Sequence, residues 1–299
     1  MMSKNISNEE TTGALPYTLF RHSYALTTHL ALPLVRFIQK RRIRAGKEDD
    51  SRAKEREGVA SIARPQGKLI WVHAASIGES LAVLPVIERI LAREQDISVL
   101  VTTGTLTSAR ILKERLPERA FHQFVPFDRL AWVQAFLDFW TPSMVIWVES
   151  ELWPNTLISV KERGIPAILI NGRMSHESFR RWKFAPSIAA GILSCFEQCL
   201  MQSTEDARYL LHLGARGVVH HGNLKYSAPP LPYDAEVLSS LRGLIGERPV
   251  WLFASTHVGE EQIAAEVHQA LEKKFPGLLT IIVPRHPDRG VDIVAELRA

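Results

Sequence analysis

The feature that most constrains this chain is a repeated alternation of short apolar runs with longer amphipathic segments. The first six apolar runs are LIWV (69–72), ISVLVTT (97–103), MVIWV (144–148), AILIN (167–171), CLMQS (199–203) and GVVHHG (217–222). Segments of helical period fall between them, at about 80–93, 107–116, 129–139, 153–163 and 204–213. Strands that alternate with helices form parallel sheets covered on both faces, and nearly continuous apolar strands are typical of such sheets. We therefore expect an α/β fold whose first Rossmann-like domain spans residues 67–226.

A second, shorter alternation follows a proline-rich segment. Residues 227–248 contain APPLP (228–232), a stiff extended sequence of the kind that joins domains. Two further apolar runs, 250–256 and 278–284, alternate with helical segments at 259–274 and 289–298. Two strands and two helices bury too little area for a stable open sheet of their own. Residues 249–299 are therefore expected to be a partial second Rossmann-like domain, either truncated or packed against the first.

The N-terminal part divides into three segments. Residues 1–14 are polar and expected to be disordered, and residues 46–66 are a charge-mixed linker. Between them, residues 15–45 are rich in Leu, Tyr and Phe and end in a collar of Lys and Arg. Only 14 residues without a formal charge separate Arg21 from Arg36, fewer than the roughly 20 apolar residues that span a bilayer. The pattern predicts a helix lying on an anionic membrane surface, with a helix packed on its own protein as the alternative.

Charge and cysteine content narrow the class of protein. Residues 1–57 carry 11 Lys and Arg against 7 Asp and Glu, which accounts for the whole net charge of +4. A nucleic-acid-binding domain would concentrate basic residues on its folded part, so no nucleic-acid partner is expected. The two cysteines, Cys195 and Cys199, exclude a disulfide framework and do not complete a zinc site. A reducing, cytosolic environment is the expectation.

The stretch HAASIGES (73–80) follows the first apolar run and contains Glu79. Ser76 and Glu79 have the S-x-x-E form of a capping box, in which the glutamate satisfies a backbone N–H. Pro85 argues against that role, because proline inside a helix removes a hydrogen bond. A helix beginning nearer Ser80 would leave Glu79 in a loop at the carboxyl end of a strand, where α/β sheets bind ligands. A helix cap and a catalytic carboxylate both stay open.

Three further strand ends carry charged or polar side chains. VESELWPN (148–155) places Glu149 and Glu151 after a strand, with an acidic helix start as the alternative. The next strand ends, in NGRMS and HHGNLK, supply Arg173, Ser175, Asn223 and Lys225. Because the carboxyl ends of parallel strands meet at one edge, these groups suit an anionic ligand and an acceptor activated by a carboxylate.

The second alternation also has polar loops after its strands. STHVGEE (255–261) opens a helix, whose free N–H groups would bind phosphate. PRHPDR (284–289) follows the next strand, with a basic turn and helix cap as the alternative. The side chains expected to bind substrate there are Ser255, Thr256, Glu260, Arg285 and His286. The sequence lacks the dinucleotide, P-loop, zincin and hydrolase signatures.

Seven motifs, taken in order, resemble those of the 3-deoxy-D-manno-octulosonic acid (Kdo) transferases of lipopolysaccharide assembly. They are HAASIGES, VTTGT, VESELWPN, NGRMS, GNLK, STHVGEE and PRHP, and the resemblance runs from about residue 15 to the last residue. It implies a two-domain GT-B glycosyltransferase at the cytoplasmic face of the inner membrane, moving Kdo from CMP-Kdo to a lipid A precursor. The family continues past PRHP into a Gly-rich nucleotide loop absent from this sequence, so the second domain is expected to be truncated.

The resemblance also implies roles for individual residues. The family's general base falls on Glu79, the first glutamate of its E-x-E-x-W-P-N motif on Glu149, and its G-N-[LI]-K lysine on Lys225. Its nucleotide-contacting P-R-H-P pair falls on Arg285 and His286. A carboxylate base is what a sugar hydroxyl requires, and a lysine would stabilise developing charge. No metal or cofactor is expected, because CMP leaves as a monophosphate and no carboxylate pair with ligand spacing marks a cation site.

Two other functions stay open. A non-catalytic remnant that binds membrane or partner surfaces would be compatible with the missing tail. A nucleotide-sugar epimerase could share the same fold, although it would need neither a lipid acceptor nor a membrane segment.

Overall fold

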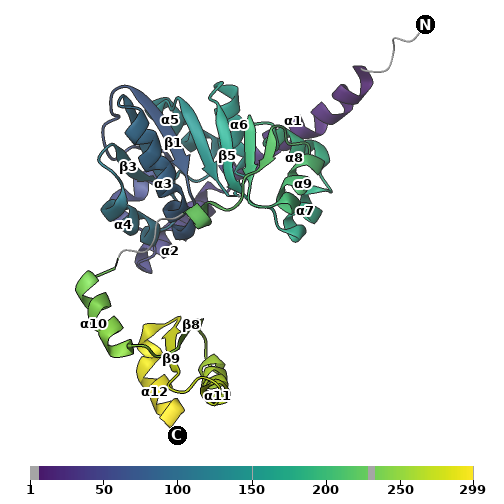
Figure 1. Cartoon of the computed structure of the whole chain (residues 1–299). Coiled ribbons are helices and arrows are strands. Elements are labelled where there is room, and N and C mark those ends of the chain that lie inside the picture. Colours follow the sequence, from purple (N-terminus) through teal and green to yellow (C-terminus); the bar gives the residue numbers. More distant parts are fainter. Residues whose placement is uncertain (1–6, 150, 228–232, 299) are drawn as a thin grey trace. The chain divides into compact units, whose positions relative to one another are not determined.

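The computed structural model describes residues 7–149, 151–227 and 233–298. The chain divides into two compact units, 1–228 and 229–299. The first unit is built on a seven-stranded sheet and the second on a two-stranded sheet (Figure 1). The proline-rich segment expected to join two domains falls on residues that lie outside this description.

The sheet of the first unit is parallel throughout, with the strand order β3-β2-β1-β4-β5-β6-β7. Its strands are β1 Lys68–His73, β2 Ile97–Thr103, β3 Ala120–Phe124, β4 Met144–Val148, β5 Ala167–Gly172, β6 Gln198–Met201 and β7 Val218–His220. The predicted α/β fold with a parallel sheet is confirmed. Strand β3 is missing from the prediction, because His122 and Gln123 interrupt its apolar pattern.

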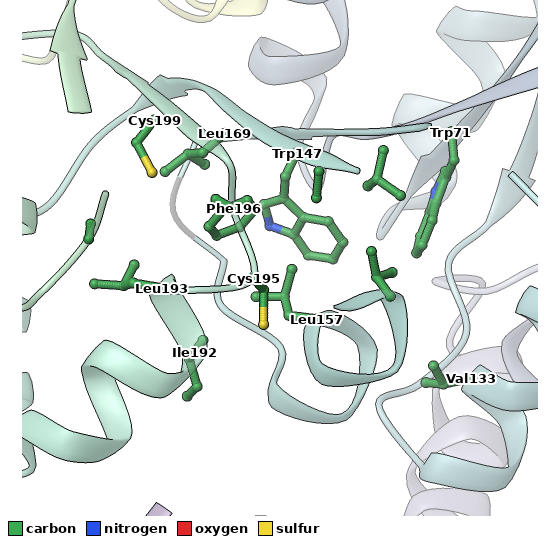
Figure 2. Packing of buried hydrophobic residues seen from close by; sticks show 14 of the residues in the cluster. Trp71, Val133, Trp147, Leu157, Leu169, Ile192, Leu193, Cys195, Phe196 and Cys199 are labelled. Atoms are coloured by element: carbon green, nitrogen blue, oxygen red, sulfur yellow. The ribbon is translucent and has the colours of Figure 1, made fainter. Parts of the chain in front are cut away.

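Helices cover both faces of this sheet, and the buried residues form two clusters, one on each face. After β1 they are α3 Ile77–Arg93, α4 Leu106–Arg115, α5 Leu130–Trp140, α6 Pro154–Glu162, α7 His176–Trp182, α8 Pro186–Leu193 and α9 Thr204–His212. Successive strand residues face opposite sides. On β1, Trp71 therefore joins a core with α5, α6 and α8, whereas Ile70 packs with α3 and α4. Figure 2 shows the first core, where the Trp147 indole lies beside Phe196 and Leu157.

The segments before the sheet are more ordered than their sequence predicts. They form α1 Ser7–Leu30, α2 Leu32–Arg44 and the 3-10 helix η1 Asp50–Glu57. Residues 7–14, expected to be disordered, belong to the first turns of α1, and residues 1–6 lie outside the described part. The prediction of a linker over 46–66 is wrong for η1, because Glu55 and Arg56 are buried there. Within the described residues, no helix is both long enough and apolar enough to cross a membrane.

Helix α1 has two chemically different faces. Tyr17 and Phe20 pack against the core of the first unit, and the Tyr24 hydroxyl donates to the partly buried Asp128 carboxylate. Four leucines on another face are exposed: Leu15, Leu19, Leu26 and Leu30. Their spacing of four, seven and four residues places them along one stripe of the helix. One face is thus packed on the protein, and the leucine stripe meets solvent.

The second unit begins with α10 Ala235–Ile245, a helix inside the segment 227–248 that the sequence predicts to be a linker. A parallel pair of strands, β8 Val250–Thr256 and β9 Leu279–Pro284, follows. The remaining elements are α11 Glu260–Glu272, η3 Pro287–Arg289 and α12 Gly290–Arg298. Among the described residues of this unit, the buried apolar side chains are Ala264 and Ile293. The predicted strand and helix order is present, with α10 in addition.

Candidate active site at the carboxyl edge of the first sheet

Glu79 lies in the first turn of α3, immediately beyond β1. Ser76 is the N-cap of this helix, so Glu79 is not in the preceding loop and Pro85 lies inside the helix, contrary to the loop alternative. The Glu79 N–H donates to Ser76 Oγ at 3.3 Å. In return, the Glu79 carboxylate accepts from the Ser76 hydroxyl and from the Ala75 N–H, each at 2.7 Å. The reciprocal hydrogen bonds of Ser76 and Glu79, in the manner of a capping box, therefore fix the orientation of this carboxylate.

The surroundings of Glu79 also set its affinity for a proton. The residue is 8% exposed, and this loss of solvent raises the pKa of its carboxyl. Hydrogen bonds from Ser76 and Ala75 lower that pKa, and the negative charge of Glu149 raises it. The net shift is upward, which makes Glu79 a better proton acceptor near neutral pH. Each carboxylate oxygen keeps a second lone pair, so a cap and a base can be the same residue.

Glu149 and Lys225 form an ion pair at the same edge. The Lys225 ammonium lies 3.4 Å from Glu149 Oε1, and the Lys225 side chain is half exposed. A Cβ placed on Gly78 would lie 3.8 Å from Lys225 Nζ, so the lysine reaches the first turn of α3 beside Glu79. Glu149 itself has a left-handed backbone, with φ of 60°. Such a conformation is costly for a non-glycine residue and is typical of functional sites. The three predicted catalytic residues are therefore brought together.

A buried amide network, which the sequence reasoning does not single out, holds Lys225 in place. Asn171 at the end of β5 is 2% exposed and has a φ of 53°. Its Oδ1 accepts from the Leu224 N–H at 3.0 Å, and its Nδ2 donates to Glu149 Oε1 at 3.4 Å. Gln202 Nε2 donates to the Asn171 carbonyl at 2.9 Å, while the Gln202 side-chain oxygen accepts from Asn223 Nδ2 at 3.1 Å.

Asn223 closes this network. Its Oδ1 accepts from the Lys225 N–H at 2.9 Å, at the start of the 3-10 helix η2 Leu224–Ser227. The sequence predicts that Asn223 binds substrate, and in the structure its side chain bonds to Gln202 and to the Lys225 N–H. Asn171 is the first residue of the NGRMS motif, two positions before Arg173, and this position is the signal in the sequence that points to it.

Arg173 and Ser175 border a small cavity next to Glu149. Its volume is about 210 Å³, and Met174, Ser178 and Trp182 complete its lining. The Ser175 hydroxyl oxygen accepts from the Ser178 N–H at 3.2 Å and thereby caps α7. Arg173 is exposed, so its guanidinium is accessible to an anion at the mouth of this cavity.

The predicted residues of the second unit separate into internal and accessible groups. The Thr256 hydroxyl donates to buried Glu261 at 2.8 Å, and Glu260 accepts from the His257 N–H at 2.7 Å, so both support the loop before α11. Ser255 is exposed, with a left-handed φ of 63°. The other two predicted residues, Arg285 and His286, are exposed after β9.

A buried ion pair fixes the basic turn of this unit. Arg289 donates to Glu261 at 2.9 Å and 3.2 Å in a fork-like arrangement. These hydrogen bonds lower the pKa of Glu261 to about 2. Across the described ranges, no three His, Cys, Asp or Glu side chains come together as a potential metal site.

Solved structures with similar folds include nucleotide-sugar enzymes. A UDP-GlcNAc 2-epimerase from Neisseria meningitidis, bound to UDP-GlcNAc, superposes with a TM-score of 0.52 at 16% identity, covering 77% of this chain and 69% of that one. A glycosyltransferase from Rickettsia africae gives a TM-score of 0.50 at 13% identity, covering 78% and 66%. At these identities the likeness concerns the fold, and it confirms the predicted GT-B type.

Sequence relatives are more specific. A probable mitochondrial 3-deoxy-D-manno-octulosonic acid transferase of Arabidopsis thaliana is 38% identical over 295 residues, covering 96% of this chain and 65% of the relative. The 3-deoxy-D-manno-octulosonic acid transferases of Rickettsia bellii and Rickettsia felis are 36% and 40% identical, covering 89% and 79% of this chain. The chain spans 63% and 50% of the length of these two. Residues 51–228 match the family model of the 3-deoxy-D-manno-octulosonic-acid transferases, and the chain belongs to this family.

Proposed function

We propose that this protein transfers Kdo from CMP-Kdo to a hydroxyl group of a lipid A precursor in lipopolysaccharide biosynthesis. The observation that carries the proposal is the buried carboxylate of Glu79, whose pKa is raised, beside the Glu149–Lys225 pair. Membership of the family supports the sugar and the reaction class.

In this reaction, Glu79 takes the proton of the acceptor hydroxyl. The acceptor oxygen forms a bond to the anomeric carbon of Kdo, the bond from that carbon to the phosphate oxygen breaks, and CMP leaves with the electron pair. A positioned base typically accelerates such a step by about 10²–10⁴-fold. The Lys225 ammonium, held by Glu149, supplies positive charge where negative charge develops during transfer.

Binding of the two substrates is assigned to different loops. Arg173 is accessible beside Glu149 and is suited to an anionic group of the sugar acid or of the acceptor. Ser255, Arg285 and His286 are accessible in the second unit and are suited to the nucleotide monophosphate. Ser175, Asn223, Thr256 and Glu260 are assigned a supporting role, because their side chains already bond to neighbouring loops.

The acceptor is a lipid, and α1 and α2 offer a surface for the membrane that contains it. Besides the exposed leucines of α1, Leu34 and Phe37 are exposed on α2. Lys40, Arg41 and Arg44 follow within the last two turns of α2, all exposed. Apolar side chains next to a basic cluster bind anionic bilayers from one side. We assign this surface to the cytoplasmic face of the inner membrane.

The test is product analysis with the 299-residue chain. It is incubated with CMP-Kdo and a lipid A precursor, and the lipid is followed by mass spectrometry. The expected result is a lipid heavier by one or more Kdo residues, together with released CMP. Unchanged lipid would contradict transfer. Conversion of a free nucleotide sugar without lipid would instead favour an epimerase.

A further inference from the structure

A buried arginine outside the predicted site touches the loop that carries Glu79. Arg56 of η1 is 3% exposed. Its Nη2 donates to the Gly104 carbonyl at 2.7 Å, and its Nη1 donates to the Val125 carbonyl at 3.2 Å. Gly104 directly follows β2, and Val125 directly follows β3. One guanidinium thus ties η1 to the carboxyl ends of two strands.

The Gly104 contact continues to Glu79 in two steps. The Gly104 N–H donates to the Ala75 carbonyl at 3.2 Å, and the Ala75 N–H donates to Glu79 Oε2 at 2.7 Å. A Cβ on Gly104 would lie 3.2 Å from the same Ala75 carbonyl, so the two loops are closely packed. The orientation of the Glu79 carboxylate therefore depends on where Gly104 lies, and Arg56 holds Gly104.

A buried carboxylate, that of Glu48, also keeps Arg56 in position. Both oxygens of buried Glu48 lie 3.2 Å from Arg56 Nη2, and Glu48 also accepts from Arg42 of α2 at 3.1 Å. The Phe124 ring stacks on the Arg56 guanidinium at 4.6 Å. A charge buried at this depth is costly unless it is paired and hydrogen-bonded. The same two strand ends could be joined by apolar packing, so a buried guanidinium indicates a need for directed hydrogen bonds.

We infer that Arg56 is a positioning residue for the general base: through Gly104 and Ala75 it fixes the loop 73–76 and thereby the carboxylate of Glu79. The role of Glu79 as the base rests on the proposed function. The hydrogen bonds that link Arg56 to Glu79 are independent of it. Arg56 does not reach the reacting atoms itself. Its loss leaves Glu48 with Arg42 alone and frees the Gly104 carbonyl.

The experiment compares Arg56→Gln with Arg52→Gln. Arg52 is the matched control, because it also anchors η1, through Glu55 and the His122 carbonyl, but has no bond to Gly104. Two readouts are used: hydrogen–deuterium exchange of the amides in 73–80, and kcat and KM for transfer. For Arg56→Gln we expect exchange of the Ala75 amide to become at least about tenfold faster. We expect kcat to fall by about 10- to 100-fold with little change in donor KM.

Arg56→Lys is a control for the possibility that Arg56→Gln unfolds. It keeps a cation opposite Glu48 but lacks the fork that reaches two carbonyls, so it should fold like the wild type and still show fast exchange at Ala75. Equal exchange and equal kcat in Arg56→Gln and Arg52→Gln at matched stability would overturn the inference. If the wild type transfers no Kdo, the proposed function fails, while the exchange comparison still decides whether Arg56 positions the Glu79 loop.

Discussion

Asn171 provides the sharpest test of how the site is held together. Replacement by alanine removes the Oδ1 that accepts from the Leu224 N–H and leaves that partly buried donor without its partner, at a cost of about 1–3 kcal/mol. Alanine must also adopt the left-handed φ of 53°, which costs roughly 1–2 kcal/mol and which asparagine tolerates better. The two terms add to about 2–5 kcal/mol of unfolding free energy.

Asn171→Gly separates these terms, because glycine adopts a positive φ without strain. We expect it to be less destabilised than Asn171→Ala by about 1 kcal/mol, an estimate reduced by glycine's greater freedom in the unfolded chain. Urea unfolding followed by tryptophan fluorescence measures both. Transfer should fall in both variants, because Lys225 follows Leu224 and loses its fixed position. A loss below about 1 kcal/mol in Asn171→Ala, equal to that of the glycine variant, would refute the reasoning.

Three further predictions concern other parts of the chain. Burial raises the pKa of Cys195 to about 11 and that of Cys199 to about 12. A thiol-reactive disulfide at pH 8 should therefore modify the native protein at least about 100-fold more slowly than the unfolded chain. Equal rates would show that the thiols are accessible. The pKa of Glu261 is lowered to about 2, so its ion pair with Arg289 stabilises the second unit above the pKa of the unfolded chain, and this stabilisation is lost as the pH falls from about 4.5 towards 2. The NMR signal of the Trp251 indole should report this loss of stability in the wild type as the pH falls. Arg289→Gln lacks the ion pair and should show no such loss over the same pH range. High salt should release the protein from anionic vesicles; retention through salt and alkaline carbonate would contradict peripheral binding.

The sheet was predictable from sequence because its strands are buried on both faces. Runs such as 69–72 and 144–148 are nearly continuous in apolar residues, and a parallel sheet requires this. Strand β3 lies at the sheet edge and contains polar side chains, so periodicity does not reveal it. The segment 46–66 is misleading for another reason. Its charged residues are typical of a solvated segment, but Arg56 and Glu48 form a buried ion pair in the folded chain.

The candidate site was predictable to the extent that strand ends converge. Glu79, Glu149 and Lys225 come together because their strands are parallel and their loops lie at one edge. The sequence pattern does not reveal the hydrogen bonds that hold these three residues in place. Asn171 contacts Glu149 and Leu224 across 22 and 53 residues of sequence, and no local spacing encodes such contacts. Residues whose side chains bond to distant backbone groups therefore emerge only from the structure.

The pH dependence of Kdo transfer by Glu79→Gln is the most direct test of whether Glu79 is the general base. Glutamine can still accept from the Ala75 N–H and donate to Ser76 Oγ, so the capping box and the fold are preserved. Glu88→Gln, an exposed change on the same helix, is the matched control.

Initial rates of Kdo transfer are measured against pH for the wild type and both variants. We expect a wild-type rate that rises through a pKa above the ordinary value for glutamate, because burial raises the pKa of Glu79. We expect Glu79→Gln to be at least about 100-fold slower and to lose this rise, whereas Glu88→Gln should behave as the wild type. A Glu79→Gln variant that keeps the wild-type rate and pH profile would contradict the claim that Glu79 is the base.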